Sequence, residues 1–386
     1  MTVYPLAGAI RPYAWGSRTV LAELQGRPSP SEAPEAELWL GAHPGDPSTV
    51  TAASGPVSLT TLIADDPAGQ LGAAVAETFG PRLPYLLKVL AAEEPLSLQA
   101  HPDPAYAREA WARQQADPTL PKNYTDAHHK PEMLVALTTF EALCGFRSTD
   151  AAADDLEALG IGALAPVIKG LRDADLRTAV KTLLTWPEHD RPGLIESVVA
   201  AGTSELASRL AEHYPGDPGV LVALLLNHVR LQPGEAIWMP AGNLHAYLHG
   251  AGIELMAASD NVLRGGLTPK RVDVGELLKV LRFEVLDDPL LPATEIAPGI
   301  LTWRVPVPDF ALFRIAVDGT RPPTEVPAAG PRIIISMEGD LFVGAAVDGT
   351  PVELTAGSAA YAPADAGRIK LAGDGVAFVA AVPSQP

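Results

Sequence analysis

The chain carries its most informative stretch at residues 97–103, which read Ser97-Leu98-Gln99-Ala100-His101-Pro102-Asp103. We predict a strand here, so Gln99 and His101 face one side of a sheet and the residue between them faces the other. An amide oxygen and an imidazole nitrogen side by side provide half of a metal site. We expect the other half from the carboxylate of Glu132 and the imidazole of His245.

A second motif lies at residues 234–245, where Gly234 is followed after five residues by Pro240-Ala241-Gly242 and then, two residues later, by His245. This order of turn, strand and turn resembles the second motif of the cupin barrel, in which the Pro/Gly turn brings the chain back with the histidine facing inward. The first motif then supplies the remaining ligands, Gln99, His101 and Glu132. The sequence thus predicts a mainly β fold with a cupin (jelly-roll) barrel. Two nitrogen and two oxygen ligands fit zinc, manganese or iron.

Length, charge and cysteine content limit the architecture and the partners. A chain of 386 residues with 47% hydrophobic residues is expected to form two or three packed units. The formal net charge of −18 disfavours a nucleic-acid partner. A single cysteine, Cys144, excludes an internal disulfide and fits a reducing compartment. With no leader and no long apolar run in view, we expect a monomer in the cytoplasm that does not contact membranes.

The sequence pattern divides the chain into three predicted units. Residues 1–147 and 231–291 form the metal-binding cupin unit, in which residues 1–100 are expected as short strands and turns. Leucines at helical spacing predict an all-helical insertion at 148–230. Strands with glycine turns over 292–386 predict a C-terminal β-sandwich that is itself cupin-like. Within this scheme we expect helices at 19–24, 105–116 and 274–280, and helical structure through 220–229.

Positively charged side chains are expected to converge on the metal of this acidic chain. Lys130 shares a face with Glu132 if the segment is extended. Lys88 interrupts an apolar strand, where an ammonium must face a cavity or be paired. Arg264 and Lys270 lie in a polar stretch further along the chain. These cations around one metal ion indicate a small anionic substrate with a phosphate or carboxylate group.

Several of these residues also have a purely structural interpretation. Asp260 and Arg264 would form a buried pair that holds the loop, and Lys270 would form a surface ion pair. Trp15 and Trp39 either line a sugar-sized pocket or pack in the core.

The other histidines are mostly expected outside the metal site. His43 opens a Pro/Gly turn, His228 is predicted to pack within a helix, and His249 is predicted to lie in a loop. His128 and His129 adjoin the site, and one of them is expected to be catalytic or to orient a ligand.

Five segments resemble the type I mannose-6-phosphate isomerases (phosphomannose isomerases) and occur in that family's order: Tyr13–Gly16, Glu37–Pro44, Leu87–Asp103, Asp126–Glu132 and Gly242–Lys270. The resemblance implies a zinc-dependent interconversion of mannose 6-phosphate and fructose 6-phosphate through a cis-enediol. It places one zinc ion on Gln99, His101, Glu132 and His245. The active-site arginine of the family falls on Arg264.

The sequence does not decide which residue transfers the proton. Removing a proton next to a carbonyl needs a positioned base and a group that stabilises the oxyanion. His129, Lys130 and Glu254 are the candidate bases, and Lys130 is favoured because a buried amine beside a metal can lose its proton. The competing hypothesis is a metal-containing cupin that binds a sugar phosphate without catalysis. The residues expected to contact phosphate or hydroxyl groups are Ser97, Lys88 and Lys270.

Overall fold

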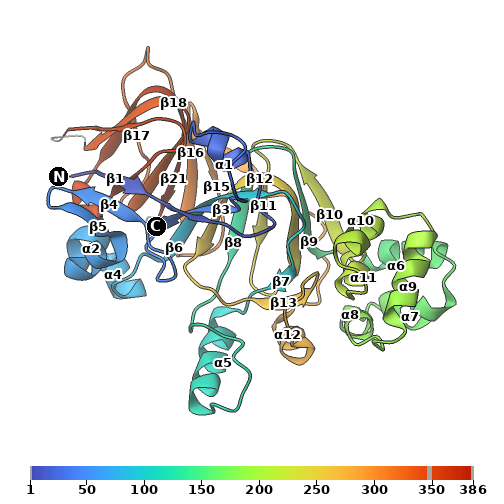
Figure 1. Ribbon diagram of the computed structural model, residues 1–386. Helices are drawn as coiled ribbons and strands as arrows, with labels where there is room; N and C mark the ends of the chain where they lie inside the picture. Colours follow the sequence, from blue (N-terminus) through green and yellow to red (C-terminus); the bar gives the residue numbers. More distant parts are fainter. Residues whose placement is uncertain (1, 346–349, 384–386) are drawn as a thin grey trace.

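The computed structural model describes residues 2–345 and 350–383. Two large antiparallel sheets lie side by side in the body of the molecule, and a group of helices projects from one end (Figure 1). This is the mainly β architecture with a helical insertion that the sequence predicts. Within the described ranges, no helix combines the length and the apolar character needed to cross a membrane.

The first sheet has ten strands and is built around β12 (His245–Ala257), which pairs with β6, β7, β8 and β9. Two features of β12 shape this sheet. Its register against β9 shifts between Tyr247 and His249, and Gly250 adopts a φ of 115°. A Cβ at Gly250 would lie 2.6 Å from the carbonyl oxygen of Thr139, so only glycine fits. The other strands are β2 (Ala9–Arg11), β3 (Glu37–Gly41), β6 (Tyr85–Ala92), β7 (Leu98–Ala100), β8 (Glu132–Ala136), β9 (Phe140–Phe146), β10 (Leu226–Leu231), β11 (Ala236–Met239) and β13 (Leu263–Gly266).

The second sheet has eleven strands drawn from both ends of the sequence. β1 pairs with β20 on one side and with β4 on the other, so N-terminal strands extend a sheet made mostly of C-terminal residues. From the N-terminal part come β1 (Tyr4–Ala7), β4 (Thr49–Ala52) and β5 (Gly55–Ser58). The rest are β14 (Ala293–Ala297), β15 (Ile300–Trp303), β16 (Ala311–Val317), β17 (Thr324–Glu325), β18 (Arg332–Ala345), β19 (Val352–Leu354), β20 (Ala359–Ala362) and β21 (Ile369–Ala381).

Three helices near the N-terminus were not predicted. Besides the expected helix α1 (Val20–Leu24), the structure contains α2 (Leu59–Asp65), α3 (Pro67–Leu71) and α4 (Ala73–Phe79). The expectation of only strands and turns there was wrong because these helices are five to seven residues long. A helix this short does not complete an apolar repeat that periodicity can detect. Two further short helices lie in the C-terminal part of the chain, α12 (Val274–Val280) and η2 (Ala364–Ala366).

The helical insertion follows β9 and projects from the first sheet (Figure 1). Its apolar core is continuous with that sheet, because Leu98 and Leu263 belong to the same buried cluster as the insertion's leucines. The helical pattern predicted over 220–229 is wrong beyond α11, because Leu226–Leu231 forms strand β10 and puts His228 on a strand. The helices are α6 (Thr149–Ala158), η1 (Gly162–Leu164), α7 (Ala165–Arg172), α8 (Leu176–Leu184), α9 (Arg191–Ala200), α10 (Glu205–His213) and α11 (Gly219–Ala223).

Helix α5 (Pro104–Ala116) lies between the first two metal-ligand segments and begins as predicted. The Asp103 carboxylate accepts hydrogen bonds from the backbone N–H groups of Ala105 and Tyr106, at 2.9 and 2.8 Å. Pro104 takes the first helical position, where its missing N–H costs nothing. The chain therefore leaves β7 directly into a helix, and the loop that follows returns it to Glu132.

Candidate metal centre and substrate cavity

Three potential ligand atoms meet inside the first sheet. Glu132 Oε2 lies 3.3 Å from His101 Nε2 and 3.1 Å from His245 Nε2, and all three side chains are buried. Each residue stands at the end of a strand, with His101 just after β7, Glu132 opening β8 and His245 opening β12. The spacing of these atoms suits a single metal ion.

Hydrogen bonds orient the two imidazole rings so that their Nε2 lone pairs face the Glu132 carboxylate. His101 Nδ1 lies 2.7 Å from the carbonyl oxygen of Asn261, and His245 Nδ1 lies 3.1 Å from that of Asn243. A carbonyl only accepts, so each Nδ1 carries the proton and each Nε2 presents a lone pair. Burial lowers the pKa of His101 to about 4, so this ring is neutral. Its Nε2 atom has no hydrogen-bond partner among the residues that the structure describes.

The Glu132 carboxylate faces the two imidazole lone pairs, and a cation between these three groups would neutralise their repulsion. Burial would raise the pKa of Glu132, but the ammonium of Lys130 outweighs burial and holds this pKa well below its usual range. Two lone pairs and a carboxylate facing each other in a dry interior repel unless a metal ion lies between them. The donor set is therefore well suited to zinc.

Gln99 and the predicted turn lie beside these three ligands. On β7, Gln99 pairs with His245 of β12 on one side and with Arg264 of β13 on the other. Gly242 adopts a φ of 79° and donates its N–H to the carbonyl oxygen of His101 at 2.8 Å. The Pro240–Gly242 turn is thus hydrogen-bonded to a ligand-bearing residue and leads into His245, as its sequence predicts.

A cavity of about 340 Å³ opens next to the ligands. Its walls bring together most of the residues singled out in the sequence: Trp15, Lys88, Ser97, Gln99, Lys130, Glu132, Glu254, Asp260, Arg264 and Lys270. His129 is not among the lining residues, since its Nε2 atom lies 3.0 Å from the carboxylate of Asp309. His249 lies on β12 and is exposed, so the expected loop position was wrong.

Two cations face this cavity in different ways. Lys130 Nζ lies 2.6 Å from Glu132 Oε1 and is buried. Arg264 is half-buried, burial lowers its pKa, and no carboxylate among the described residues opposes the shift. The Asp260–Arg264 pair considered from the sequence is not formed, because Asp260 lies 3.5 Å from His43 Nε2. Arg264 therefore presents an uncompensated positive charge to the cavity.

Lys88 belongs to a buried network in the cavity wall. Its Nζ lies 2.8 Å from Glu254 Oε2 and 3.4 Å from Glu37 Oε1. Tyr247 donates its hydroxyl to the other oxygen of Glu254 at 2.8 Å, and Trp39 donates its indole N–H to Glu37 at 2.7 Å. Burial would lower the pKa of Lys88, but the two carboxylates outweigh it and raise the pKa. Lys88 is therefore a charged member of a satisfied network.

Sequence reasoning missed Glu37 and Tyr247 in this network. Glu37 could have been found in the same way as Lys88, because it is a charged residue at the start of an apolar strand. In the structure, the strand register places Trp39 and Glu254 opposite Lys88. Tyr247 gives no such signal, because an apolar strand commonly contains a tyrosine. Trp39 lines the cavity and is also buried against Leu86 and Met256, so both interpretations apply to it.

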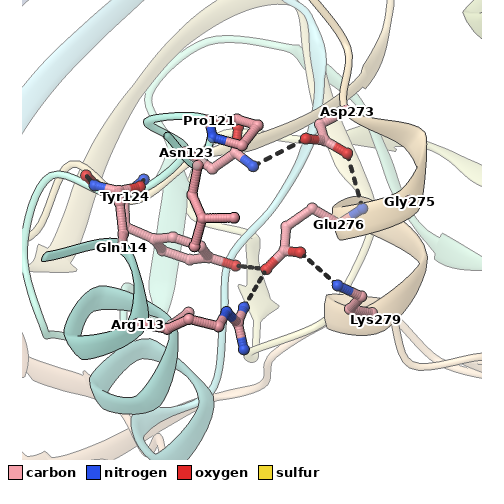
Figure 2. Close-up of a pocket in the computed structure, with 11 residues that line it drawn as sticks. Arg113, Gln114, Pro121, Asn123, Tyr124, Asp273, Gly275, Glu276 and Lys279 are labelled. Atoms are coloured by element: carbon pink, nitrogen blue, oxygen red, sulfur yellow. Dashed lines mark hydrogen bonds and ion pairs between the residues drawn. The ribbon is translucent and has the colours of Figure 1, made fainter. Parts of the chain in front are cut away.

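A second pocket lies between α5, the following loop and α12 (Figure 2). Its centre is Glu276, which accepts hydrogen bonds from the Tyr124 hydroxyl at 2.8 Å and from Lys279 at 2.9 Å, with Arg113 at 3.3 Å. Asn123 donates to Asp273 at 3.0 Å. The charges here are paired with one another, so this cluster fixes the loop that leads to Lys130.

Comparisons with known proteins agree with this geometry. A family model described as "Phosphomannose isomerase type I, catalytic domain" matches residues 3–149. Mannose-6-phosphate isomerase from Escherichia coli is 36% identical, with 96% of this chain and 97% of that protein covered. The human mannose-6-phosphate isomerase is 33% identical, with 93% of each covered.

Solved structures give the same result. A zinc-bound mannose 6-phosphate isomerase superposes with a TM-score of 0.91 at 33% identity, covering 100% of both chains. An arginine-to-alanine mutant of phosphomannose isomerase from Salmonella typhimurium gives a TM-score of 0.91 at 33% identity, covering 99% of this chain and 100% of that one. The similarity thus extends over both sheets and the helical insertion.

Proposed function

The chain belongs to the type I phosphomannose isomerase family, and on that premise we propose how its centre and cavity interconvert mannose 6-phosphate and fructose 6-phosphate. The chain is an isomerase, and its cofactor is zinc. The observation that carries the proposal is the combination in one cavity of convergent metal-ligand atoms with an uncompensated arginine. A sugar phosphate supplies both the oxygens for the metal and the anion for the cations.

We assign the metal to Gln99, His101, Glu132 and His245. Bound zinc supplies positive charge that polarises the substrate's carbonyl and hydroxyl oxygens. The carbonyl groups of Asn261 and Asn243 orient the two imidazole rings toward that site. Gln99 is assigned through its place on β7, facing the cavity between His245 and Arg264.

Proton transfer is assigned to Lys130. His129 is engaged by Asp309, and Glu254 is held by Lys88 and Tyr247, each at 2.8 Å. Lys130 alone of the three candidate bases from the sequence combines a place in the cavity wall with contact to a metal ligand. Once the Lys130 ammonium has released its proton to solvent, its neutral amine takes the proton from C2 of the aldose and returns it to C1, while a hydroxyl proton passes between the two oxygens. No atom is gained or lost in the exchange.

Arg264 is assigned to the charge that develops on the substrate. An enediol carries oxyanion character on neighbouring carbons, and a fixed guanidinium stabilises that charge more than it stabilises the neutral sugar. Lys270 and Ser97 line the same cavity and are assigned to phosphate or hydroxyl contacts. Asp260 and Trp15 are assigned to the sugar, as a hydroxyl partner and a flat apolar surface.

The finer sequence-based expectations are also proposals. We propose a cytoplasmic monomer without nucleic-acid or membrane partners, supported by the net charge of −18 and the single buried cysteine. We also propose the division into residues 1–147 with 231–291, 148–230, and 292–386. Strands β1, β4 and β5 then link the first of these units to the last. Light scattering of the purified chain and limited proteolysis test these statements.

The deciding experiment pairs a metal assay with an isomerase assay. Purified protein is expected to contain zinc and to convert fructose 6-phosphate to mannose 6-phosphate, to lose activity with a chelator and to regain it with zinc. In deuterated water the product should carry solvent deuterium at C2. Zinc-loaded protein that binds the sugar phosphate without this exchange would instead be a binding cupin.

A further inference from the structure

The segment from Arg264 to Lys270 forms one edge of the substrate cavity in an unusual backbone shape. Gly266 has a φ of 121° and Leu267 a φ of 53°. Among the described residues, Leu267 is one of only two non-glycine residues with positive φ, the other being Ala174. A leucine in this region is disfavoured by its Cβ, so the surrounding structure must offset the strain.

The helical insertion supplies the groups that hold this shape. The carboxylate of Asp217, in the turn before α11, accepts hydrogen bonds from the backbone N–H groups of Leu267 at 2.9 Å and Thr268 at 3.1 Å. The same carboxylate accepts the N–H of Gly219 at 2.7 Å. The Leu267 side chain is 1% exposed and belongs to the insertion's apolar core. Backbone and side chain of the strained residue are therefore both fixed by the insertion.

The two backbones also touch directly. A Cβ on Gly219 would lie 2.6 Å from the nitrogen of Leu267, and a Cβ on Gly266 would lie 2.6 Å from the Cα of Gly219. Real side chains do not fit at such distances, so both glycines are required by the contact. Tyr214, three residues before Asp217, lines the cavity and donates its hydroxyl to the carbonyl oxygen of Pro95 at 2.5 Å.

We propose that Asp217 is a positioning residue for substrate binding, through which the helical insertion holds the cavity edge at Thr268–Lys270 in the shape that receives the substrate. The proposal rests on the proposed function only in naming the substrate. Asp217 does not line the cavity, so it acts through the segment that it holds. The insertion thereby gains a role in substrate binding, although Tyr214 is the one described residue of 148–230 that lines the cavity.

Three variants test the proposal, with zinc content, steady-state kinetics and hydrogen exchange of residues 262–271 as readouts. Asp217→Ala removes all three hydrogen bonds, whereas Asp217→Asn keeps one oxygen. If the released segment holds the binding shape one-tenth of the time, apparent affinity falls about tenfold. We therefore expect Asp217→Ala to raise KM for fructose 6-phosphate about tenfold, with kcat changed less and zinc retained. Asp217→Asn should give an intermediate KM, and amide exchange at Leu267 and Thr268 should accelerate in both.

The matched control is Asp175, an exposed carboxylate in the same insertion that caps α8 by accepting the N–H of Thr178 at 2.9 Å. Asp175→Ala removes a comparable bond that involves neither the cavity lining nor residues 262–271, and it should leave KM and local exchange unchanged. Should Asp217→Ala fail to fold, Asp217→Asn and Gly219→Ala carry the test, because a methyl group at Gly219 displaces the nitrogen of Leu267.

Two results would overturn the proposal. One is a wild-type KM together with wild-type exchange in the Asp217 variants. The other is an equal rise of KM in the Asp175 control, which would reveal general destabilisation. Absence of isomerase turnover in the zinc-loaded wild type would instead refute the proposed function. The exchange measurement would still decide whether Asp217 holds the segment.

Discussion

Replacing Arg264 with alanine tests whether the positive charge of the cavity acts on the reaction and not on the fold. The guanidinium is half-buried, and within the described part of the chain no carboxylate opposes the effect of burial on its pKa. Its removal therefore leaves no buried protein charge unpaired. We expect the free energy of unfolding to change by less than about 0.5 kcal/mol, as for ordinary surface substitutions.

The expected loss of activity follows from the position of this charge. Two unit charges about 4 Å apart attract by about 4 kcal/mol at an effective dielectric constant of about 20. Solvent reaches part of the Arg264 side chain and screens the interaction, so we take about half of this value. A loss of about 2 kcal/mol of transition-state stabilisation lowers kcat/KM about thirtyfold.

The assay is steady-state isomerisation of fructose 6-phosphate, together with zinc content and the melting temperature. Arg271→Ala is the matched control, because Arg271 follows the same segment, is exposed and pairs with Asp273 at 3.3 Å. It should retain wild-type kcat/KM. The reasoning is refuted if Arg264→Ala loses its zinc, or if its kcat/KM stays within about threefold of the wild type.

Three further predictions concern the metal and the acid stability. His245→Ala should lose zinc because it removes a buried ligand, and atomic absorption should find the metal in Arg264→Ala but not in this variant. Chelation should lower the melting temperature reversibly, since a ligand present at about 100 times its Kd stabilises by about 2.7 kcal/mol; an unchanged temperature would mean that the fold does not depend on the metal. Hydrogen bonds from His228 and then Arg209 outweigh burial and lower the pKa of Glu141 from 4.5 to about 2. A carboxylate whose pKa is lower in the folded than in the unfolded chain stabilises the fold at any pH above its unfolded pKa. The difference in melting temperature between wild type and Glu141→Gln should therefore be full above pH 4.5 and shrink as the pH falls toward 2. A constant difference would show that the ion pairs of Glu141 add no stability.

Part of the proposed metal site could be predicted from the sequence because some of its geometry is local, whereas the meeting of His101, Glu132 and His245 depends on how distant strands pack. Gln99 and His101 share a strand face, and a Pro/Gly turn precedes His245. Helix α5 was likewise predictable from its Asp103 cap and Pro104, since such signals act within one turn. The direction in which these side chains face is decided by neighbours in the chain.

Other features depend on which strands pair, and this information is not local. Nothing in Tyr4–Ala7 indicates that β1 pairs with β20, more than 350 residues away. His129 was a candidate base because it stands next to Lys130, but its partner Asp309 comes from a distant loop. The apolar residues of 226–231 continue the spacing of α11, and only pairing with β9 decides that they form a strand.

The register shift in β12 has a consequence for how the sequence can change over evolution. His245 and Glu254 are nine positions apart, and in a regular strand an odd spacing places two side chains on opposite faces. Between Tyr247 and His249, β12 has one residue more than the facing stretch of β9. This extra residue brings the two side chains back to the same face, so that the Tyr247 hydroxyl reaches Glu254. Deleting one residue there would turn one of the two groups away from the cavity. A substitution at this bulge therefore keeps both groups in the cavity, whereas a change in its length needs a second, compensating change elsewhere in the strand.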